Sequence, residues 1–283
     1  MKKNNQIQKY SKNFQNKFLK DYLQESYLKK NFDKTKFTKK IKNSATFEKY
    51  ILEKLYTNNL IVKKNIKLEN VHLYVKKNQF TKENSSSDIT RNTLTEYFFN
   101  KDKIFFNIYK KIIFELKREF QFDFLYQKDP FLRFNFPTKK KEDNLLPHVD
   151  LALGHPPGEI NIWLPITNVS KNNSMSISTL EYSNNFFSKY NFNFQKYIKA
   201  YNYSIKKKAE KILIPYVAKK GEAAIFDGRI MHKSLLNNSK KTRVSLDFRI
   251  LPVIYEKSAK KYIGTGYLKQ RFIRGKYYNI KNA

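Results

Sequence analysis

The chain has 283 residues, enough for one large domain or two small ones with a substantial buried core. It carries 57 Lys and Arg residues against 24 Asp and Glu residues, a formal net charge of +33. The basic residues are mostly lysines spread along the whole chain, so A/T-rich codon usage is a simpler source of the charge than a nucleic-acid surface. A content of 40% hydrophobic and 16% aromatic residues excludes intrinsic disorder for most of the chain.

The chain contains no cysteine, which excludes a disulfide framework, a thiolate metal site and a cysteine nucleophile. No apolar stretch approaches the length of a membrane span. The basic segment 1–14 is not followed by the apolar core of a secretory signal peptide. We therefore expect a cytoplasmic protein without a membrane partner.

Helices are predicted first in the N-terminal half. Residues 45–56 place Phe47, Ile51 and Leu55 four positions apart, on one helical face. Residues 102–120 form a longer apolar stripe with Lys and Glu on the opposite face, and the stripe consists of Ile104, Ile108, Ile112, Leu116 and Phe120. A further helix is expected near residues 191–208.

From about residue 131 the polar and apolar residues alternate with a period of two, which predicts strands at 131–136, 159–166, 223–226 and 243–250. Short strands separated by turns are typical of an antiparallel sandwich or barrel. The sequence thus predicts an α+β fold, a jelly roll with helices on the outer face of one sheet. Residues 1–125 would form a mainly helical support region, and residues 126–283 the β core of one integrated domain.

One of the four histidines begins a candidate metal-binding motif. His148 is followed two residues later by Asp150, and on a strand such side chains project from the same face. Chance alone supplies this spacing in roughly one such sequence in seven. A second histidine, His232, is followed after eleven residues by Arg243 and then by Ser245. The combined pattern has a chance frequency of roughly one in several hundred.

Eleven residues suffice for the end of one strand, a tight turn and the start of its antiparallel neighbour, so we expect Arg243 to point toward His232. Two histidines and one carboxylate on one face of a metal leave the opposite positions open, as in non-haem Fe(II) oxygenases. Those positions can accept a bidentate 2-oxo acid and then dioxygen. A distal carboxylate on that acid needs a planar, permanently charged partner, which arginine supplies better than lysine.

Two stretches of the chain resemble the Fe(II)/2-oxoglutarate-dependent oxygenases, whose pattern is His-x-Asp, a distant His and then Arg-x-Ser. They are residues 146–168 (LPHVDLALGHPPGEINIWLPITN) and 219–252 (KKGEAAIFDGRIMHKSLLNNSKKTRVSLDFRILP). Within the phytanoyl-CoA hydroxylase-like superfamily, the similarity is to the streptomycin-biosynthesis oxygenase-like branch. The first 125 residues carry no motif of this family.

The resemblance implies a cupin-like double-stranded β-helix in which His148, Asp150 and His232 are the catalytic iron ligands. It implies that Arg243, assisted by Ser245, anchors the distal carboxylate of the co-substrate 2-oxoglutarate. The activity it implies is that of a dioxygenase that uses O2 to hydroxylate a C–H of a small polar metabolite, derived from a sugar, an aminocyclitol or an amino acid. Succinate and CO2 would be released.

Four other residues are candidates for the lining of the pocket. Asn161 and Trp163 share the polar face of one predicted strand, and ordinary packing is their alternative role. Arg133 and Asn135 share a face of another strand and would contact the co-substrate or the substrate, unless this strand lies at the surface.

Arg249 shares the strand face of Arg243 and could reach a polar or anionic substrate, although a salt bridge with Asp247 or Glu222 is the simpler expectation. His155 lies in the turn sequence GHPPGE, where we expect a loop histidine and not a fourth ligand.

Two other functions remain open. Arg243 and Arg249 match the paired arginines of AlkB-type nucleic-acid demethylases, and the positive charge would suit phosphates. The Asn-x-Tyr segment of those enzymes is missing, so nucleic acid is the less favoured partner. A non-catalytic, cupin-like binding module would keep the fold but take up no iron. The sequence indicates neither the substrate nor the oligomeric state.

Overall fold

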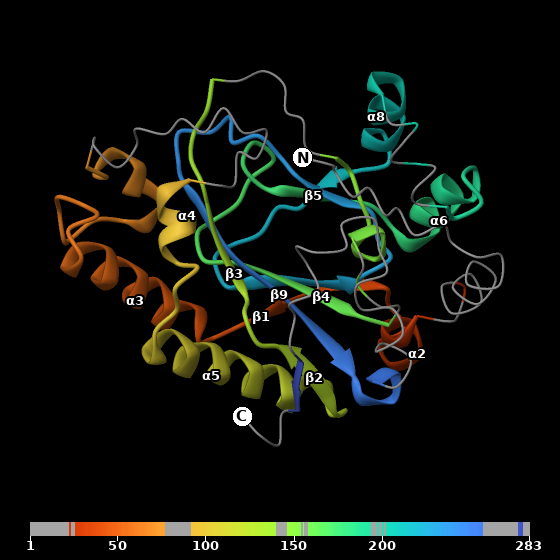
Figure 1. Cartoon of the computed structure of the whole chain (residues 1–283), viewed down its shortest axis with the longest axis horizontal. Helices are drawn as coiled ribbons and strands as arrows, with labels where there is room; N and C mark the ends of the chain where they lie inside the picture. The colour runs from red at the N-terminus through yellow and green to blue at the C-terminus, as the bar shows by residue number, and fades with distance from the viewer. Residues whose placement is uncertain are drawn as a thin grey trace, which may run out of the picture.

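The computed structural model describes residues 23, 26–76, 92–139, 146–153, 155, 158–193, 197, 200, 202–256 and 277–279. Their strands form two sheets, one of seven strands and one of three, in which every pairing is antiparallel. Helices lie on both sides of this arrangement (Figure 1). The predicted mixture of helices and antiparallel strands is therefore confirmed.

The larger sheet has the strand order β1-β7-β4-β9-β2-β10, and β3 also pairs with β9. The strands β2 and β3 pair with successive parts of the same edge of β9, while β4 pairs with its other edge. In chain order, the strands of this sheet are β1 (Lys36–Lys40), β2 (Phe124–Gln127), β3 (Phe131–Asn135), β4 (Ile160–Pro165), β7 (Glu222–Asp227), β9 (Arg243–Pro252) and β10 (Tyr277–Asn279).

The smaller sheet has the order β6-β5-β8, with β5 (Met175–Ile177), β6 (Ile214–Pro215) and β8 (His232–Ser234). The expectation that the strand of His232 pairs with the strand of Arg243 is wrong. Strand β8 pairs with β5, whereas β9 pairs only with strands of the larger sheet. The ten residues between His232 and Arg243 therefore connect two sheets and do not close a hairpin.

One face of the larger sheet is apolar and is covered by helices. The side chains of Ile162, Ile225 and Leu246 on this face belong to one buried cluster with Phe47 and Ile112. These last two residues lie on α3 (Ser44–Thr57) and α5 (Lys103–Phe120), both on the same side of the sheet (Figure 1). The predicted helical cover is thus confirmed, and β1 adds an edge strand from the N-terminal part of the chain.

The helices at 45–56 and 102–120 are confirmed, with one correction. The Asp102 side chain accepts a hydrogen bond from the Phe105 N–H (2.8 Å) and so caps the first turn of α5. The buried stripe of α5 includes Phe105 and Tyr109, while Ile104 is 59% exposed and lies outside it. Phe105 and Tyr109 are buried in place of Ile104, so the buried face of α5 is rotated away from Ile104.

The remaining helices are short. The predicted helix near 191–208 corresponds to α8, which begins only at residue 203, and α6 precedes it. These two lie on the side of the molecule away from α3 and α5 (Figure 1). The bounds are α2 (Tyr27–Phe32), α4 (Thr93–Tyr97), α6 (Leu180–Ser188) and α8 (Tyr203–Glu210), with 3-10 helices η1 (Leu68–Leu73), η3 (Asp150–Leu153) and η4 (Val253–Tyr255).

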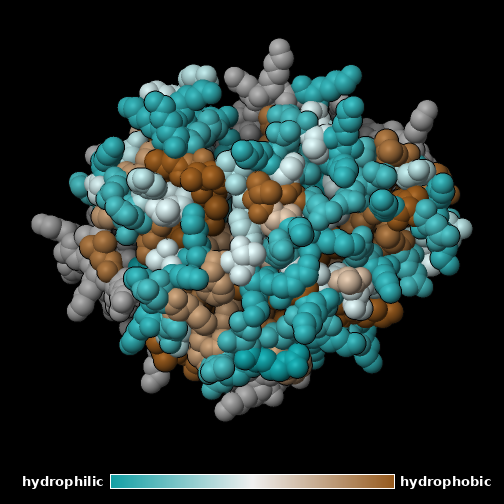
Figure 2. Space-filling view, turned by 180° about the vertical axis from the view of Figure 1, so that it is seen from behind, coloured by the Kyte–Doolittle hydropathy of each residue, from teal (hydrophilic) through white to brown (hydrophobic). Residues whose placement is uncertain are grey.

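The surface in Figure 2 is covered mostly by hydrophilic residues, between which smaller hydrophobic areas are exposed. In the part of the chain that the structure describes, no helix is both long enough and apolar enough to cross a membrane.

The helix-covered face should dominate stability. Phe248 on β9 is 1% exposed and packs edge-to-face against Tyr109 of α5, with ring centroids 5.1 Å apart. We expect Phe248→Ala to lower the free energy of unfolding by about 3–5 kcal/mol, measured by urea denaturation, because it leaves a cavity in this core. The matched control is Ile254→Ala, at a side chain that is 68% exposed, and should change it by less than about 0.5 kcal/mol. Equal effects of the two substitutions would contradict this description of the core.

Candidate functional site

His148 and His232 are brought together by a single isolated β-bridge. The His148 N–H donates to the His232 carbonyl (3.1 Å), and the His232 N–H donates to the His148 carbonyl (2.9 Å). Two residues further, the Asp150 N–H donates to the Gly228 carbonyl (3.1 Å). The segment of His148 and Asp150 thus runs along the chain that leads into β8, and the two imidazole rings lie 4.6 Å apart.

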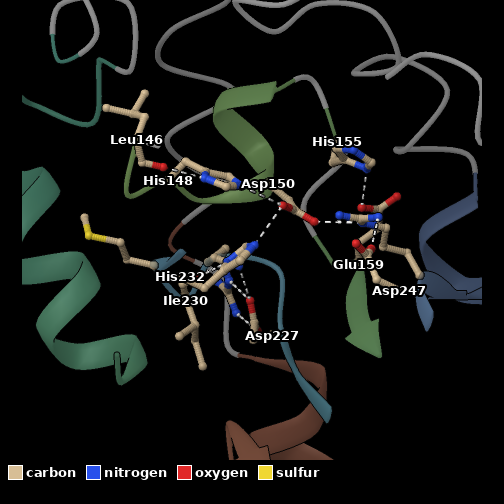
Figure 3. A network of polar contacts seen from close by, with 12 residues as sticks. Leu146, His148, Asp150, His155, Glu159, Asp227, Ile230, His232 and Asp247 are labelled. Carbon is tan, nitrogen blue, oxygen red and sulfur yellow. Dashed lines mark hydrogen bonds and ion pairs between the residues drawn. The ribbon is translucent and has the colours of Figure 1, made fainter. Parts of the chain in front are cut away.

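The ring Nε2 atoms of both histidines face one oxygen of Asp150. The distance to Asp150 Oδ1 is 3.4 Å from His232 Nε2 and 3.9 Å from His148 Nε2 (Figure 3). The Nδ1 atoms lie against main-chain carbonyls, 2.8 Å from Leu146 O for His148 and 3.0 Å from Ile230 O for His232. With Nδ1 protonated and donating, each Nε2 keeps its lone pair for a metal.

Asp150 Oδ1 is buried and has no hydrogen-bond partner among the described residues. A buried carboxylate oxygen left open between two imidazole nitrogens has the chemistry of a cation ligand. His148, Asp150 and His232 each offer a ligand atom within 4.8 Å of the others, so this group can hold a metal ion. The structure therefore brings together the three residues that the sequence selected.

Electrostatics give His148 and Asp150 the protonation states that a divalent metal needs. Burial, together with the neighbouring His232 ring, lowers the pKa of His148 to about 4, so its imidazole is neutral at pH 7. Burial alone would raise the pKa of Asp150, but the charge of Arg249 and the nearby His232 outweigh it and hold this pKa well below its usual range. Neither group has to lose a proton when a metal binds near neutral pH.

Arg249 fixes the second oxygen of Asp150. Its Nε donates to Asp150 Oδ2 (2.8 Å), and its Nη1 donates to Asp247 Oδ1 (2.9 Å). Asp247 Oδ2 accepts in turn from Arg133 Nε (2.8 Å). The expected salt bridge of Arg249 with Asp247 is confirmed, while Glu222 instead accepts from the main-chain N–H of Lys219. The contact with Asp150 is one that the sequence analysis missed.

The second face of the larger sheet carries the remaining candidates among its polar residues, beside an apolar cluster that includes Trp163 and Phe226. Residues directly opposite each other in an antiparallel pair point to the same face. The register of β9 places Asn135 opposite Arg243, Arg133 opposite Ser245 and Asn161 opposite Arg249. The polar residues of β3, β4 and β9 on this face, together with the one tryptophan, are Arg133, Asn135, Asn161, Trp163, Arg243, Ser245, Asp247 and Arg249.

Arg243 is fully buried, and most of its donors are unused. Its Nη1 donates to the carbonyl of Ser174 (2.9 Å), whereas its Nε and Nη2 have no hydrogen-bond partner in the described structure. The hydroxyl of Ser245, also buried, has none either. The Trp163 ring centroid lies 5.7 Å from the guanidinium carbon, and burial lowers the pKa of Arg243 to about 9. Unfilled buried donors are costly, and a planar anion such as a carboxylate would fill them.

The other candidates divide into two kinds. Arg133 is engaged by Asp247, and the Asn135 amide donates to the carbonyl of Leu235 (3.1 Å), so both contact protein groups. Asn161, in contrast, has both amide atoms buried without a partner among the described residues. It lies between Phe226 of β7 and Arg249 of β9 and therefore faces the site.

A buried pair of His155 and Glu159 was not predicted. His155 lies in a loop, as expected, but it is 7% exposed, and its Nδ1 lies 2.8 Å from Glu159 Oε2 (Figure 3). Burial alone would lower the pKa of His155, but the Glu159 carboxylate outweighs it and raises this pKa. With Asp150, these residues form a second group whose ligand atoms lie within 4.8 Å. The spacing of four residues between His155 and Glu159 was the available signal.

Arg229, in the turn between β7 and β8, forms a bidentate ion pair with Asp227. Its Nε and Nη2 donate to the two carboxylate oxygens at 2.8 and 2.7 Å, and both residues are buried. This pair stabilises the turn between β7 and β8, which leads to His232.

No family model matches the chain. Over 121 residues it is 29% identical to the streptomycin biosynthesis protein StrG of Streptomyces griseus, a match that covers 42% of this chain and 44% of that protein. The chain thus matches less than half the length of this curated relative. The match confirms the predicted resemblance to streptomycin biosynthesis proteins.

Two solved structures have distant similarity to the chain. AviO1 from Streptomyces viridochromogenes Tue57 is 12% identical, with a TM-score of 0.48, and the match covers 79% of this chain and 93% of that one. EctD from S. alaskensis with bound Fe is 10% identical, with a TM-score of 0.42, and the match covers 82% and 78%. Both TM-scores are below 0.5, so neither structure defines the activity of this chain.

The surroundings of His148 and His155 shift their pKa values in opposite directions in the metal-free protein. His148 should remain neutral until the pH falls to about 4, whereas the pKa of His155 should lie above the ordinary value of 6.5. Histidine NMR signals followed over pH, with assignment by His148→Asn and His155→Asn, would measure both values. A pKa of His148 at or above 6.5 would contradict the burial of its ring against His232.

Proposed function

We propose that the protein is an Fe(II)- and 2-oxoglutarate-dependent dioxygenase that hydroxylates a C–H of a small polar metabolite. The observation that carries the proposal is a pair of buried sites with unfilled polar atoms, each of which includes or contacts an arginine of β9. One is Asp150 Oδ1, open between two imidazole nitrogens, and the other is the Arg243 guanidinium, with Nε and Nη2 unfilled. The first suits a cation and the second suits a carboxylate.

The donor set fits a ferrous ion. His148, His232 and Asp150 would hold the metal through two nitrogens and one oxygen, which leaves positions open for further ligands. Arg249 would keep Asp150 ionised and bound through one oxygen only, because it occupies Oδ2. When bound, Fe(II) with 2-oxoglutarate and dioxygen would supply the oxidising power for C–H hydroxylation, with release of succinate and CO2.

The Arg243 site fits the distal carboxylate of 2-oxoglutarate. Nε and Nη2 of one guanidinium can donate two parallel hydrogen bonds to one carboxylate, and the Ser245 hydroxyl can add a third. Trp163 would shield this ion pair from water, since it packs beside the guanidinium. A bound carboxylate would also pair with the buried charge of Arg243, whose pKa burial lowers.

Asn161 would bind the metabolite or the co-substrate through its open amide, because nothing else in the described structure uses either amide atom. Arg133 and Asn135 would support the site from β3 through Asp247 and Leu235, and would not contact ligands directly. The likeness to a streptomycin biosynthesis protein supports a substrate derived from a sugar, an aminocyclitol or an amino acid.

We also propose that the two antiparallel sheets are the walls of a double-stranded β-helix, with the metal ligands at the smaller sheet and the carboxylate anchor on the larger one. The pairing of β1 with β7 supports the proposal that residues 1–125 and 126–283 form one integrated domain, since it joins the two parts within one sheet.

Separate substitutions should distinguish the two sites. Anaerobic Fe(II) with 2-oxoglutarate should give the weak visible charge-transfer band of a chelated keto acid. Asp150→Ala should abolish the band because the metal loses its central oxygen ligand. Arg243→Met should leave Fe(II) binding intact but raise the 2-oxoglutarate concentration needed by about 10- to 100-fold.

The matched control is Arg118→Met, at an exposed arginine of α5, which should leave both affinities unchanged. An unchanged band in Asp150→Ala would remove Asp150 from the ligand set. A parallel loss of iron and 2-oxoglutarate in Arg243→Met would contradict the assignment of two separate sites.

The substrate class is tested by a screen for stimulated succinate formation, with sugars, aminocyclitols, amino acids and methylated oligonucleotides in separate pools. We expect stimulation by one of the small-molecule pools and none by the oligonucleotides. Stimulation by oligonucleotides, with an affinity that falls steeply with added salt, would favour the AlkB-type alternative. No iron uptake and no succinate under any condition would favour a non-catalytic binding module.

A further inference from the structure

The segment between β5 and β6 contacts both of the chain segments that carry the histidines. It contains α6, Tyr197 and α8, and it lies on the side of the molecule away from the helices that cover the larger sheet (Figure 1). Its contacts with the ligand segments are made by residues adjacent in sequence to the two histidines.

Three polar contacts join this segment to the neighbours of the histidines. The Tyr197 hydroxyl donates to the carbonyl of Pro147 (2.9 Å), the residue before His148. The N–H of Met231, the residue before His232, donates to the Ser183 hydroxyl (2.8 Å). Lys233 follows His232, and its Nζ lies 2.6 Å from Glu210 Oε1 of α8.

Apolar contacts join the same surfaces. Along an extended chain, successive side chains point to opposite sides, so the neighbours of a site-facing histidine point away from the site. Met231 and Val149 accordingly belong to one buried cluster with Phe186, Phe187 and Tyr197 of the β5–β6 segment. All five side chains are at most 8% exposed. The β5–β6 segment therefore packs against the ligand segments on the side that faces away from the site.

Strand β8, which begins at His232, pairs with β5, whereas His148 lies outside the named strands of the described structure. The main-chain pairing of the two histidines is one isolated bridge, and the side-chain contact of Arg249 with this group is made to Asp150. A metal site requires its ligand atoms to be held within about 0.5 Å of the productive geometry. Small shifts of Pro147 or Met231 would move an imidazole directly.

We propose that the described residues of segment 180–210 form a positioning layer that sets the spacing of His148 and His232 and thereby the affinity for the metal. This inference rests on the proposed function, since it assigns the β5–β6 segment a role at the same metal site. Tyr197 and Ser183 are its positioning residues, one for each histidine.

The test is anaerobic titration with Fe(II) alone, at a temperature where thermal unfolding shows every metal-free variant to be folded. Tyr197→Phe keeps the ring in the buried cluster but removes the hydrogen bond to Pro147, and Ser183→Ala removes the acceptor for Met231 N–H. Each should raise the dissociation constant for Fe(II) by about 10- to 100-fold, the usual effect of losing a group that orients a metal ligand.

The chain offers matched controls on the helix-covered side. The Tyr109 hydroxyl is buried and donates to the carbonyl of Gln127 (2.7 Å), and the Ser44 hydroxyl donates to the carbonyl of Ile41 (2.8 Å). Tyr109→Phe and Ser44→Ala thus remove comparable buried hydrogen bonds and should leave the affinity for Fe(II) unchanged. A purely structural role of Tyr197 and Ser183 would lower thermal stability in all four variants without changing metal affinity in any.

Each outcome separates this inference from the proposed function. If the unsubstituted protein binds Fe(II) and the Tyr197 and Ser183 variants bind it equally well, the positioning layer is wrong while the proposed function stands. Equal weakening by the controls also overturns the positioning role. If the unsubstituted protein does not bind Fe(II), the proposed function fails, and this inference fails with it.

Discussion

The buried ion pair between Arg249 and Asp150 is the interaction on which the rest of the site depends. It occupies Oδ2 of the carboxylate, keeps the group ionised and leaves Oδ1 facing the two imidazoles. It also connects β9 of the larger sheet to the segment that pairs with the approach to β8. A buried pair of charges adds little net stability compared with well-packed apolar groups, so its value here lies in orientation.

The two faces of the larger sheet have different roles, because one forms the apolar core and the other carries the candidate site residues. One face packs against α3 and α5 and supplies most of the apolar core. The other face carries three arginines, two asparagines and a tryptophan. From this face Arg249 donates to Asp150, and Arg243 donates to the carbonyl of Ser174, the residue before β5. Alternation along β9 alone accounts for this division, because Val244, Leu246 and Phe248 face the helices while Arg243, Ser245 and Arg249 face the site.

Local patterns in the sequence predicted the main elements and the metal-binding group, since periodicity and short spacing are properties of contiguous residues. They could not predict which sheet a strand joins, and for this reason the pairing of the His232 strand with the Arg243 strand was wrong. Nor could they identify the contact of Arg249 with Asp150 or the burial of His155 against Glu159. The exposure of Ile104 was not predicted either, because the four-residue spacing does not take into account the larger aromatic ring of Phe105 beside it.

Strand β9 carries both Arg249, which holds the proposed metal ligand Asp150, and Arg243, the proposed anchor of the co-substrate, six positions apart on one face. The extended backbone therefore sets the distance between these two residues, at about 3.3 Å for each position along the strand. A single residue gained or lost between them would turn one arginine into the helical core. The number of residues between these two arginines therefore has to stay constant if both are to face the site.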